Sequence, residues 1–265
     1  MGETLTVASL NTRGAPLFGT HRAARSAVIA ASLEATDIDV VCLQEVHTYL
    51  HLRLLAAKMP SFARVEYAAT PLGPAGGLVT LVRGRTAAKP DFRRFGAASA
   101  RGLPWRTRLL GYLKGSLVTY LSQSAMTIVN THPSAVYDGD WSESGRFAPR
   151  QRSQYAALAR LVAELPDDQP VAVCGDFNAP ADSSAHRQLL AATGLRDAFD
   201  GRCPPTFRAE YLPAGELPHC IDFILVRGVL ASHTETLLAE PVALPSGPGP
   251  VSDHIGLRAS LLITP

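Results

Sequence analysis

Short apolar runs rich in valine, isoleucine and leucine recur along the chain, separated by polar or glycine- and proline-rich segments. Runs of four to eight such residues, bounded by turn residues, are typical of buried β-strands. The runs that predict strands are residues 5–10, 40–43, 78–82, 116–121, 126–129, 171–174, 221–226 and 255–262. Several of them follow one another with only turns between them, which does not fit a simple alternation of strands and helices.

Three segments instead carry a helical pattern. They span residues 21–35, 149–165 and 183–192. The second has Pro149 in its first turn, and the third has Asp182 as a possible N-cap. With strands outnumbering helices, we expect a layered α/β protein with mixed sheets. No linker divides the chain, so we expect one domain over residues 1–265, with surface loops at 71–77, 203–218 and 241–250.

Polar side chains stand where the predicted strands begin or end. They are Asn11, Gln44, Glu45, Asn130, Thr131, His132, Asp176, Asn178, Asp222, Asp253 and His254. A charged group at the tip of a buried strand is costly unless it is paired, solvated or bound to a metal. Because a sheet gathers such ends at one edge, these groups could converge. Oxygen ligands of this kind suit Mg²⁺, Mn²⁺ or Ca²⁺, and a neighbouring histidine suits hydrolysis of a phosphate ester.

The order of these motifs resembles the endonuclease/exonuclease/phosphatase superfamily, which includes DNase I, abasic-site endonucleases, inositol polyphosphate phosphatases and sphingomyelinases. The matching motifs are Ala8-Ser9-Leu10-Asn11, Leu43-Gln44-Glu45, Asn130-Thr131-His132, Gly175-Asp176-Phe177-Asn178, Ile221-Asp222-Phe223-Ile224 and Ser252-Asp253-His254. Any one of them is a weak signal, but all six occur in the family's order. The resemblance implies a DNase I-like, four-layer sandwich of two mixed β-sheets flanked by helices.

The resemblance also implies a metal site. Glu45 is similar to the family's principal Mg²⁺ ligand, and Asn11 to a second ligand or its close support. Asp253 would support either the metal or the catalytic histidine. Mn²⁺ or Ca²⁺ could replace Mg²⁺ at such a site.

Catalytic roles follow from the same resemblance. His254 resembles the general base or electrostatic partner at the phosphate, and Asp222 the carboxylate that orients it. Asp176 is similar to the residue that positions the attacking water, whereas Asn178 and His132 resemble donors to the phosphoryl oxygens. Metal and neutral donors would stabilise the charge that builds on those oxygens during in-line attack.

Each motif also has a plain structural alternative. The alternatives are a turn cap at Asn11, a solvated strand edge at Glu45, an Asx turn at Asp176 and Asn178, a loop histidine at His132 and a local ion pair at Asp222. Six motifs in the right order favour the catalytic interpretation over these accidents. We interpret Asp197 as structural, and as surface or loop residues the histidines His21, His47, His51, His186, His219 and His233.

Other positions favour the sphingomyelinase branch of the family. Lys114-Gly115 resembles a strand opening of that branch, and the spacing from His132 through Tyr137 and Trp141 to a helix is similar. That helix offers two arginines for a phosphate, Arg150 and Arg152. The resemblance therefore implies that Lys114, Tyr137, Trp141, Arg150 and Arg152 bind the substrate. Trp105, in the basic segment of residues 83–114, is a further substrate-binding candidate.

Charge is unevenly spread along the 265 residues, although the net charge is only +2. Residues 83–114 contain nine bases and one acid, a net charge of +8, and include Trp105 among other aromatic residues. This segment could bind an anionic membrane, bind nucleic acid, or be an ordinary exposed hairpin. Because the rest of the chain carries −6, we favour a small or lipid-borne phosphodiester or phosphomonoester, with a DNA or RNA nuclease as the alternative. A non-catalytic binding module is a weaker alternative, because both Glu45 and His254 are present.

Cysteine use and the N-terminus bear on the compartment. None of the four cysteines forms a CxxC pair, which argues against zinc, and we expect all four to be reduced thiols. Residues 1–4 lack the basic and apolar stretches of a signal peptide. We therefore expect a cytoplasmic monomer, with a secreted chain whose signal has been removed as the alternative.

Overall fold

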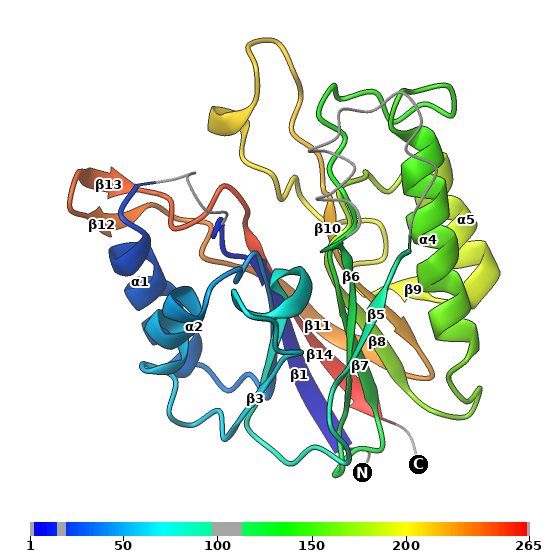
Figure 1. The fold of residues 1–265 in the computed structure, drawn as a ribbon, viewed down its shortest axis with the longest axis horizontal. Coiled ribbons are helices and arrows are strands. Elements are labelled where there is room, and N and C mark those ends of the chain that lie inside the picture. The colour runs from blue at the N-terminus through cyan, green and yellow to red at the C-terminus, as the bar shows by residue number, and fades with distance from the viewer. Residues whose placement is uncertain (1–2, 15–19, 97–112, 264–265) are drawn as a thin grey trace.

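Two six-stranded mixed sheets pack face to face, and helices cover their outer faces (Figure 1). The computed structural model describes residues 3–14, 20–96 and 113–263. The predicted four-layer arrangement of helix, sheet, sheet and helix is confirmed. No helix within the described ranges is long and apolar enough to cross a membrane.

The first sheet has the strand order β11-β14-β1-β2-β4-β3. Its strands are β1 (Glu3–Asn11), β2 (Val40–Gln44), β3 (Arg64–Glu66), β4 (Val79–Val82), β11 (Leu230–Leu237) and β14 (Gly256–Ile263). Helices α1 (Arg22–Glu34) and α2 (Tyr49–Ala56) lie on its outer face (Figure 1). Strands β1 and β2 are parallel, whereas β1 and β14 are antiparallel.

The second sheet has the order β5-β6-β7-β8-β10-β9. Its strands are β5 (Asp91–Arg94), β6 (Gly115–Tyr120), β7 (Thr127–Thr131), β8 (Val171–Asp176), β9 (Arg196–Asp197) and β10 (Asp222–Arg227). Helices α4 (Ala148–Ala163) and α5 (Ser184–Thr193) cover it. A separate hairpin joins β12 (Val242–Leu244) to β13 (Gly247–Gly249), and two 3₁₀ helices, η1 (Ala75–Gly77) and η2 (Ala209–Tyr211), lie in loops.

The central strands are buried on both faces, which explains why they read as continuous apolar runs. Alternate residues of one strand enter different cores. Val7 and Cys42 pack between the sheets, whereas Ala8 and Leu10 pack under the helices. The sequence pattern therefore identified the central strands but not the short edge strands β3, β5, β9 and β11–β13, which expose much of their surface.

Strand pairing within each sheet brings the polar ends of neighbouring strands together. Asn11 lies opposite Gln44 in the first sheet, and Asp222 lies opposite Asp176 in the second. Gly175 is required just before Asp176, because a Cβ there would lie 1.9 Å from the backbone oxygen of a residue on the adjacent β7 strand. The close approach of β7 and β8 thus fixes where the Asp176 carboxylate emerges.

Three local predictions were wrong. The N-cap of α5 is Ser183, whose side chain accepts from the backbone of His186, and not Asp182. Residues 241–250, predicted as a loop, contain the β12–β13 hairpin. Cys203 and Cys220 form a disulfide, with Cα atoms 6.1 Å apart, and only Cys42 and Cys174 are free. The paired cysteines are 17 positions apart in the sequence, and the fold of the intervening loop, which the sequence pattern did not reveal, brings them together.

Candidate active site

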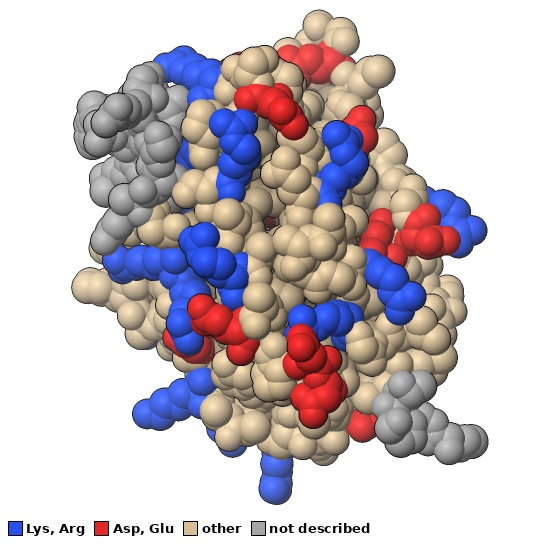
Figure 2. Space-filling view, turned by 90° about the vertical axis from the view of Figure 1, so that its right-hand side faces the viewer, with Lys and Arg blue, Asp and Glu red and all other residues tan. Residues whose placement is uncertain are grey.

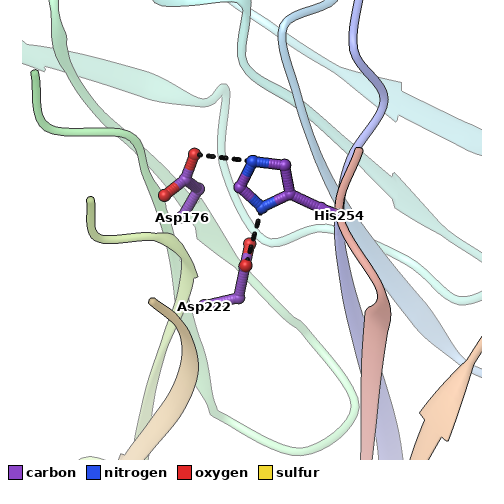
Figure 3. Close-up of side chains that lie close together, drawn as sticks. All are labelled: Asp176, Asp222 and His254. Carbon is purple, nitrogen blue, oxygen red and sulfur yellow. Dashed lines mark hydrogen bonds and ion pairs between the residues drawn. The ribbon is translucent and has the colours of Figure 1, made fainter. Parts of the chain in front are cut away.

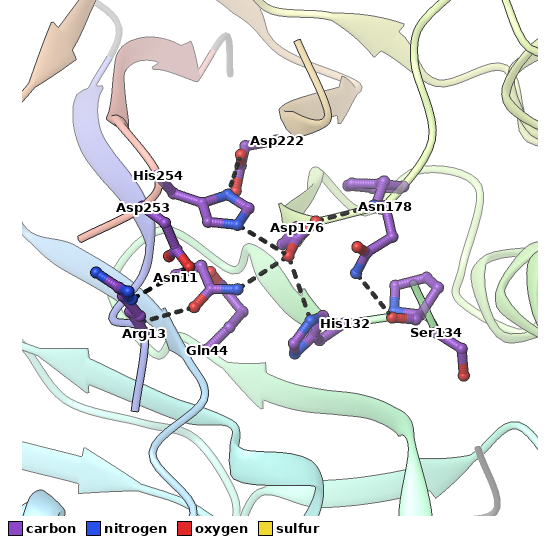
Figure 4. Close-up of polar contacts among 12 residues, drawn as sticks. Asn11, Arg13, Gln44, His132, Ser134, Asp176, Asn178, Asp222, Asp253 and His254 are labelled. Carbon is purple, nitrogen blue, oxygen red and sulfur yellow. Dashed lines mark hydrogen bonds and ion pairs between the residues drawn. The ribbon is translucent and has the colours of Figure 1, made fainter. Parts of the chain in front are cut away.

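The structure gathers the predicted strand-end residues into one buried cluster at the edge of the two sheets (Figure 4). Asn11 comes from the end of β1, His132 follows β7 and Asp176 ends β8. Asp222 opens β10, and His254 lies two residues before the start of β14. Five separate segments therefore contribute to a single polar cluster.

A histidine between two carboxylates lies at the centre of the cluster (Figure 3). The Nδ1 atom of His254 is 2.8 Å from Oδ2 of Asp222, and its Nε2 atom is 3.6 Å from Oδ2 of Asp176. Burial lowers the pKa of His254, but the charges of Asp222 and Asp176 outweigh it and raise the pKa to about 10. The imidazole is therefore protonated at neutral pH, with both ring N–H groups directed at carboxylates.

Asp176 accepts hydrogen bonds from several sides. Its Oδ2 atom receives the Asn11 amide at 2.9 Å and lies 3.3 Å from Nε2 of His132, while its Oδ1 atom receives the backbone N–H of Asn178 at 2.9 Å. Burial raises the pKa of this carboxyl, but His254, His132 and Asn11 together lower it well below its usual range. Asp176 is thus held as an anion.

Asp222 has a different environment. Burial raises the pKa of its carboxyl above the usual value, although His254 acts in the opposite direction. The two aspartates that flank His254 therefore differ, since Asp176 is the better stabilised anion.

Glu45 follows β2 in a left-handed conformation, with φ 62°, which is uncommon for a residue with a side chain. Burial raises the pKa of Glu45, but His132 and Lys114 outweigh burial and the net shift is downward, which favours the ionised form. Gly77 packs against this turn, because a Cβ there would lie 2.6 Å from the His47 ring and 3.2 Å from the Glu45 Cα atom. The turn is therefore fixed by close backbone packing.

The oxygens beside this turn are of a kind that a divalent metal takes. Burial raises the pKa of Asp253, and the negative charge of Glu45 raises it further. Two carboxylates that repel each other, together with the amide oxygen of Asn11, are hard donors of the kind that Mg²⁺ prefers. Arg13 partly balances the negative charge of Asp253, because its Nε atom lies 3.5 Å from Oδ2 of that residue.

Asp176, Asp222 and His254 also place ligand-type atoms within 4.8 Å of one another. The charges of these three side chains are matched within the group, by the 2.8 Å contact of His254 Nδ1 with Asp222 and the 3.6 Å ion pair of His254 Nε2 with Asp176.

Two further strand-end amides hold the sheets together. The Gln44 amide donates to Oδ1 of Asn130 at 2.8 Å, which links the first sheet to the second. Asn130 in turn donates to the backbone oxygens of Leu43 and Val79, at 3.1 and 2.9 Å. These buried contacts fix the spacing of the two strand ends that carry Glu45 and His132.

The side chain of Asn178, predicted to face a phosphoryl oxygen, donates instead to the backbone oxygen of Pro133 at 3.1 Å. Its own backbone oxygen accepts from the Trp141 indole at 3.1 Å and from the Gln151 amide at 2.9 Å. Trp141 thus contacts the loop that carries Asn178, and its indole N–H is used within the protein.

The remaining predicted substrate residues occupy distinct positions. Lys114 is close enough to Glu45 and Asp176 to feel their charges; burial lowers the pKa of Lys114 to about 8, and both carboxylates oppose this. Arg150 is buried in the first turn of α4, and Tyr137 is 66% exposed. Arg152 donates to the backbone oxygen of Glu143, away from the cluster, and is exposed. Trp105 lies outside the described residues.

The basic segment 83–114 is only partly described, because residues 97–112 lie outside the described ranges. Arg83 points inward and donates to backbone oxygens of residues 34, 36 and 38. Arg93 pairs with Asp91 and lies 3.7 Å from Glu164. On the face that carries α4 and α5, basic side chains are interspersed with acidic ones (Figure 2).

Two histidines that we expected at the surface are buried, and that prediction was wrong. His51 packs in the first sheet's outer layer, and His186 lies 4.3 Å from the Phe223 ring and 6.1 Å from the Phe177 ring. Burial lowers the pKa of each histidine to about 4, so both are neutral. The two phenylalanines follow Asp222 and Asp176 directly, so His186 packs beneath the catalytic strands.

The histidine between two aspartates lies at one edge of a sandwich whose family and structural neighbours are hydrolases acting on phosphate esters. The chain belongs to the endonuclease/exonuclease/phosphatase family, whose model matches residues 8–254. No curated protein sequence matches the chain significantly.

Solved structures share the fold at low sequence identity. A family protein from Bacteroides thetaiotaomicron has a TM-score of 0.76 at 16% identity, with all of both chains covered. Sphingomyelinase C from Streptomyces griseocarneus has a TM-score of 0.72 at 18% identity, covering 97% of this chain and 99% of that chain. TDP2 from D. rerio, in complex with a single-strand DNA product, has a TM-score of 0.73 at 18% identity, covering 97% and 98%. These similarities establish the fold, and the family includes enzymes that act on different phosphate esters.

Proposed function

We propose that the protein is a Mg²⁺-dependent hydrolase of a phosphodiester or phosphomonoester carried by a small molecule or a phospholipid. The observation that carries this proposal is the buried His254, held between Asp222 and Asp176 beside the oxygen donors of Glu45, Asn11 and Asp253. Such an arrangement supports in-line attack of water on phosphorus.

Each residue has a defined task in this mechanism. Glu45, Asn11 and Asp253 would hold the metal, which supplies positive charge to the phosphoryl oxygens. Asp176, held as an anion, would accept a hydrogen bond from the attacking water and so orient it. His254 enters the reaction protonated, so it donates a hydrogen bond to the phosphate as negative charge builds, and Asp222 fixes its ring orientation. Of the two roles considered for His254, the raised pKa favours the electrostatic one.

Charge near the site supports an anionic substrate. Lys114 is buried beside Glu45 and Asp176, and Arg150 is close enough to lower the pKa of Lys114 further. The side chains of Lys114 and Arg150 would bind the phosphate oxygens that the metal does not reach. We assign Tyr137 and Arg152 no direct contact with the phosphate, because the first is largely exposed and the second donates elsewhere.

Three observations bear on substrate and compartment. The basic segment 83–114 is proposed to contact the anionic surface on which a lipid substrate lies. A nuclease is the second candidate, since one structural neighbour is a complex with single-strand DNA product. The Cys203–Cys220 disulfide favours an oxidising compartment, and so the secreted alternative, over the cytoplasm.

A panel of esters tests the proposal. Choline and ethanolamine phospholipids, small phosphomonoesters and diesters, and plasmid, abasic and single-strand DNA are assayed with Mg²⁺ and with EDTA. We expect turnover of a lipid or small ester that EDTA abolishes, and loss of that turnover in Glu45→Ala. The exposed Leu72→Ala variant is the matched control and keeps full activity. Release of nucleotides from DNA without lipid turnover would establish the nuclease instead.

A further inference from the structure

A loop that the sequence analysis treated only as a surface connection contacts both members of the histidine–aspartate pair. This loop, residues 203–220, is called here the clamp segment, and the Cys203–Cys220 disulfide closes its two ends. Within it, the backbone N–H groups of Thr206 and Phe207 donate to the His219 oxygen at 3.0 and 3.3 Å, so its two arms pair with each other. The disulfide and this pairing make the base of the loop a fixed element.

Thr206 holds the strand start that carries Asp222. Its side-chain oxygen accepts from the backbone N–H of Ile221 at 3.0 Å and from that of Asp222 at 3.1 Å. Thr206 is fully buried, so water cannot replace this acceptor. Because β10 begins at Asp222, these two bonds determine where its carboxylate enters the site.

Phe207 holds His254 from the same loop. The two residues form an isolated antiparallel bridge, and their rings meet edge to face with centroids 5.1 Å apart. On either side of this bridge, the N–H of Ile255 donates to the Thr206 oxygen at 2.8 Å, and the N–H of Arg208 donates to the Asp253 oxygen at 2.9 Å. The clamp segment is therefore bonded to the chain before, at and after the catalytic histidine.

We propose that Thr206 and Phe207 are positioning residues for the Asp222–His254 pair. The inference rests on the proposed function of that pair, and neither residue touches the reacting phosphate. The hydroxyl of Thr206 fixes the backbone of Asp222. The ring of Phe207 packs against the imidazole of His254. The clamp segment thereby sets the 2.8 Å contact between two residues that are 32 positions apart in the sequence. A displacement of about 1 Å at such a contact lowers turnover by roughly 100-fold.

Three variants test this proposal by steady-state kinetics with Mg²⁺ on the best ester of the panel. Thr206→Val keeps the shape of the side chain but removes the acceptor, and we expect kcat to fall by about 10- to 100-fold while KM changes by less than about threefold. Thr206→Ser restores the hydroxyl and brings kcat back to within about threefold of wild type. Leu217→Ala, an exposed position of the same loop, is the control and leaves both constants unchanged.

A second readout does not depend on turnover. In protein labelled with ¹⁵N-histidine, NMR follows the ring nitrogens of His254, and we expect their shifts to change in Thr206→Val and in Phe207→Leu but not in Thr206→Ser. Phe207→Leu also keeps the proposal testable if Thr206→Val fails to fold. If the wild-type protein hydrolyses no ester in the panel, the proposed function fails, whereas the NMR comparison still decides the positioning role.

Two results would overturn the inference. One is wild-type kcat and unchanged His254 ring signals in Thr206→Val and Phe207→Leu. The other is a lower melting temperature in both variants with kcat per folded molecule unchanged, because this is what a purely structural loop predicts.

Discussion

Replacing Asp222 with asparagine removes one negative charge from the centre of the site while keeping the shape of the side chain. The carboxylate oxygen lies 2.8 Å from Nδ1 of His254, and both residues are buried. Asparagine can still accept a hydrogen bond, but it no longer compensates the charge of the imidazolium. In this variant Asp176 still lies beside the imidazole, with its Oδ2 atom 3.6 Å from Nε2 of His254.

The structure gives the magnitude of this change. The rise in the His254 pKa from 6.5 to about 10 corresponds to roughly 5 kcal/mol in favour of the charged ring. Asp222 is the largest of the contributions that raise this pKa, ahead of Asp176 and Asp253, so its loss removes a large part of the stabilisation. We therefore expect Asp222→Asn to reduce the free energy of unfolding by about 3 kcal/mol near pH 6, in the range for breaking a buried ion pair.

The sign of the pH dependence follows from linkage. The folded-state pKa of His254 lies above its unfolded value, so the stabilisation is complete below about pH 6.5 and is lost as the pH rises towards 10. The difference in stability between wild type and Asp222→Asn should therefore shrink from pH 6 to pH 10.

Urea denaturation of both proteins at pH 6, 7, 8, 9 and 10 measures this difference. Asp200→Asn is the matched control, because that carboxylate is 86% exposed, and we expect no measurable change there. A stability difference between wild type and Asp222→Asn that stays constant from pH 6 to pH 10 would refute the reasoning.

In the same variant kcat should fall by about 10²- to 10⁴-fold, the range for losing assistance by a positioned acid or base.

The remaining predictions concern the metal turn and the Asn178 loop. Glu45→Gln should lower the affinity for Mg²⁺ by at least about tenfold in isothermal titration calorimetry, with an unchanged circular dichroism spectrum; equal affinity would remove Glu45 from the metal site. Gly77→Ala places a Cβ 2.6 Å from the His47 ring and 3.2 Å from the Glu45 Cα atom, whereas Gly201→Ala, at a similar positive φ, meets nothing within 4 Å. Thermal denaturation should show Gly77→Ala as the less stable of the two by about 1 to 3 kcal/mol, and equal stability would contradict close packing at this turn. Trp141→Phe loses the indole bond to the Asn178 oxygen and should cost about 1 kcal/mol in urea denaturation, a loss that would be absent if the loop were held elsewhere.

The central strands and the polar groups at their ends could be predicted because both are properties of local sequence. Val171–Asp176 is apolar until its last two residues, and β8 occupies that range. Edge strands such as β11 were missed because one side of them faces solvent and their sequence carries no continuous apolar run. Helix α2 was missed because it is only eight residues long and begins directly after the Glu45 turn.

The way in which the site residues are used could not be predicted from sequence, because it depends on contacts between distant segments. The sequence places Asn178 near a phosphate, but it does not show that the Asn178 amide is bound to Pro133. The roles of Thr206 and Phe207 had no signal either, since they lie in a loop rich in glycine and proline. Their contacts exist only because the Cys203–Cys220 loop folds back onto His254.

The central claim is that His254 and a divalent metal act together on a phosphate ester. The most direct measurement is the hydrolysis of a chromogenic phosphodiester by wild type and by His254→Ala, each with Mg²⁺ and with EDTA. We predict that EDTA abolishes wild-type turnover, that Mg²⁺ restores it, and that His254→Ala lowers kcat by at least about 100-fold with the fold retained. Turnover that survives EDTA, or a His254→Ala variant close to wild type, would contradict the account.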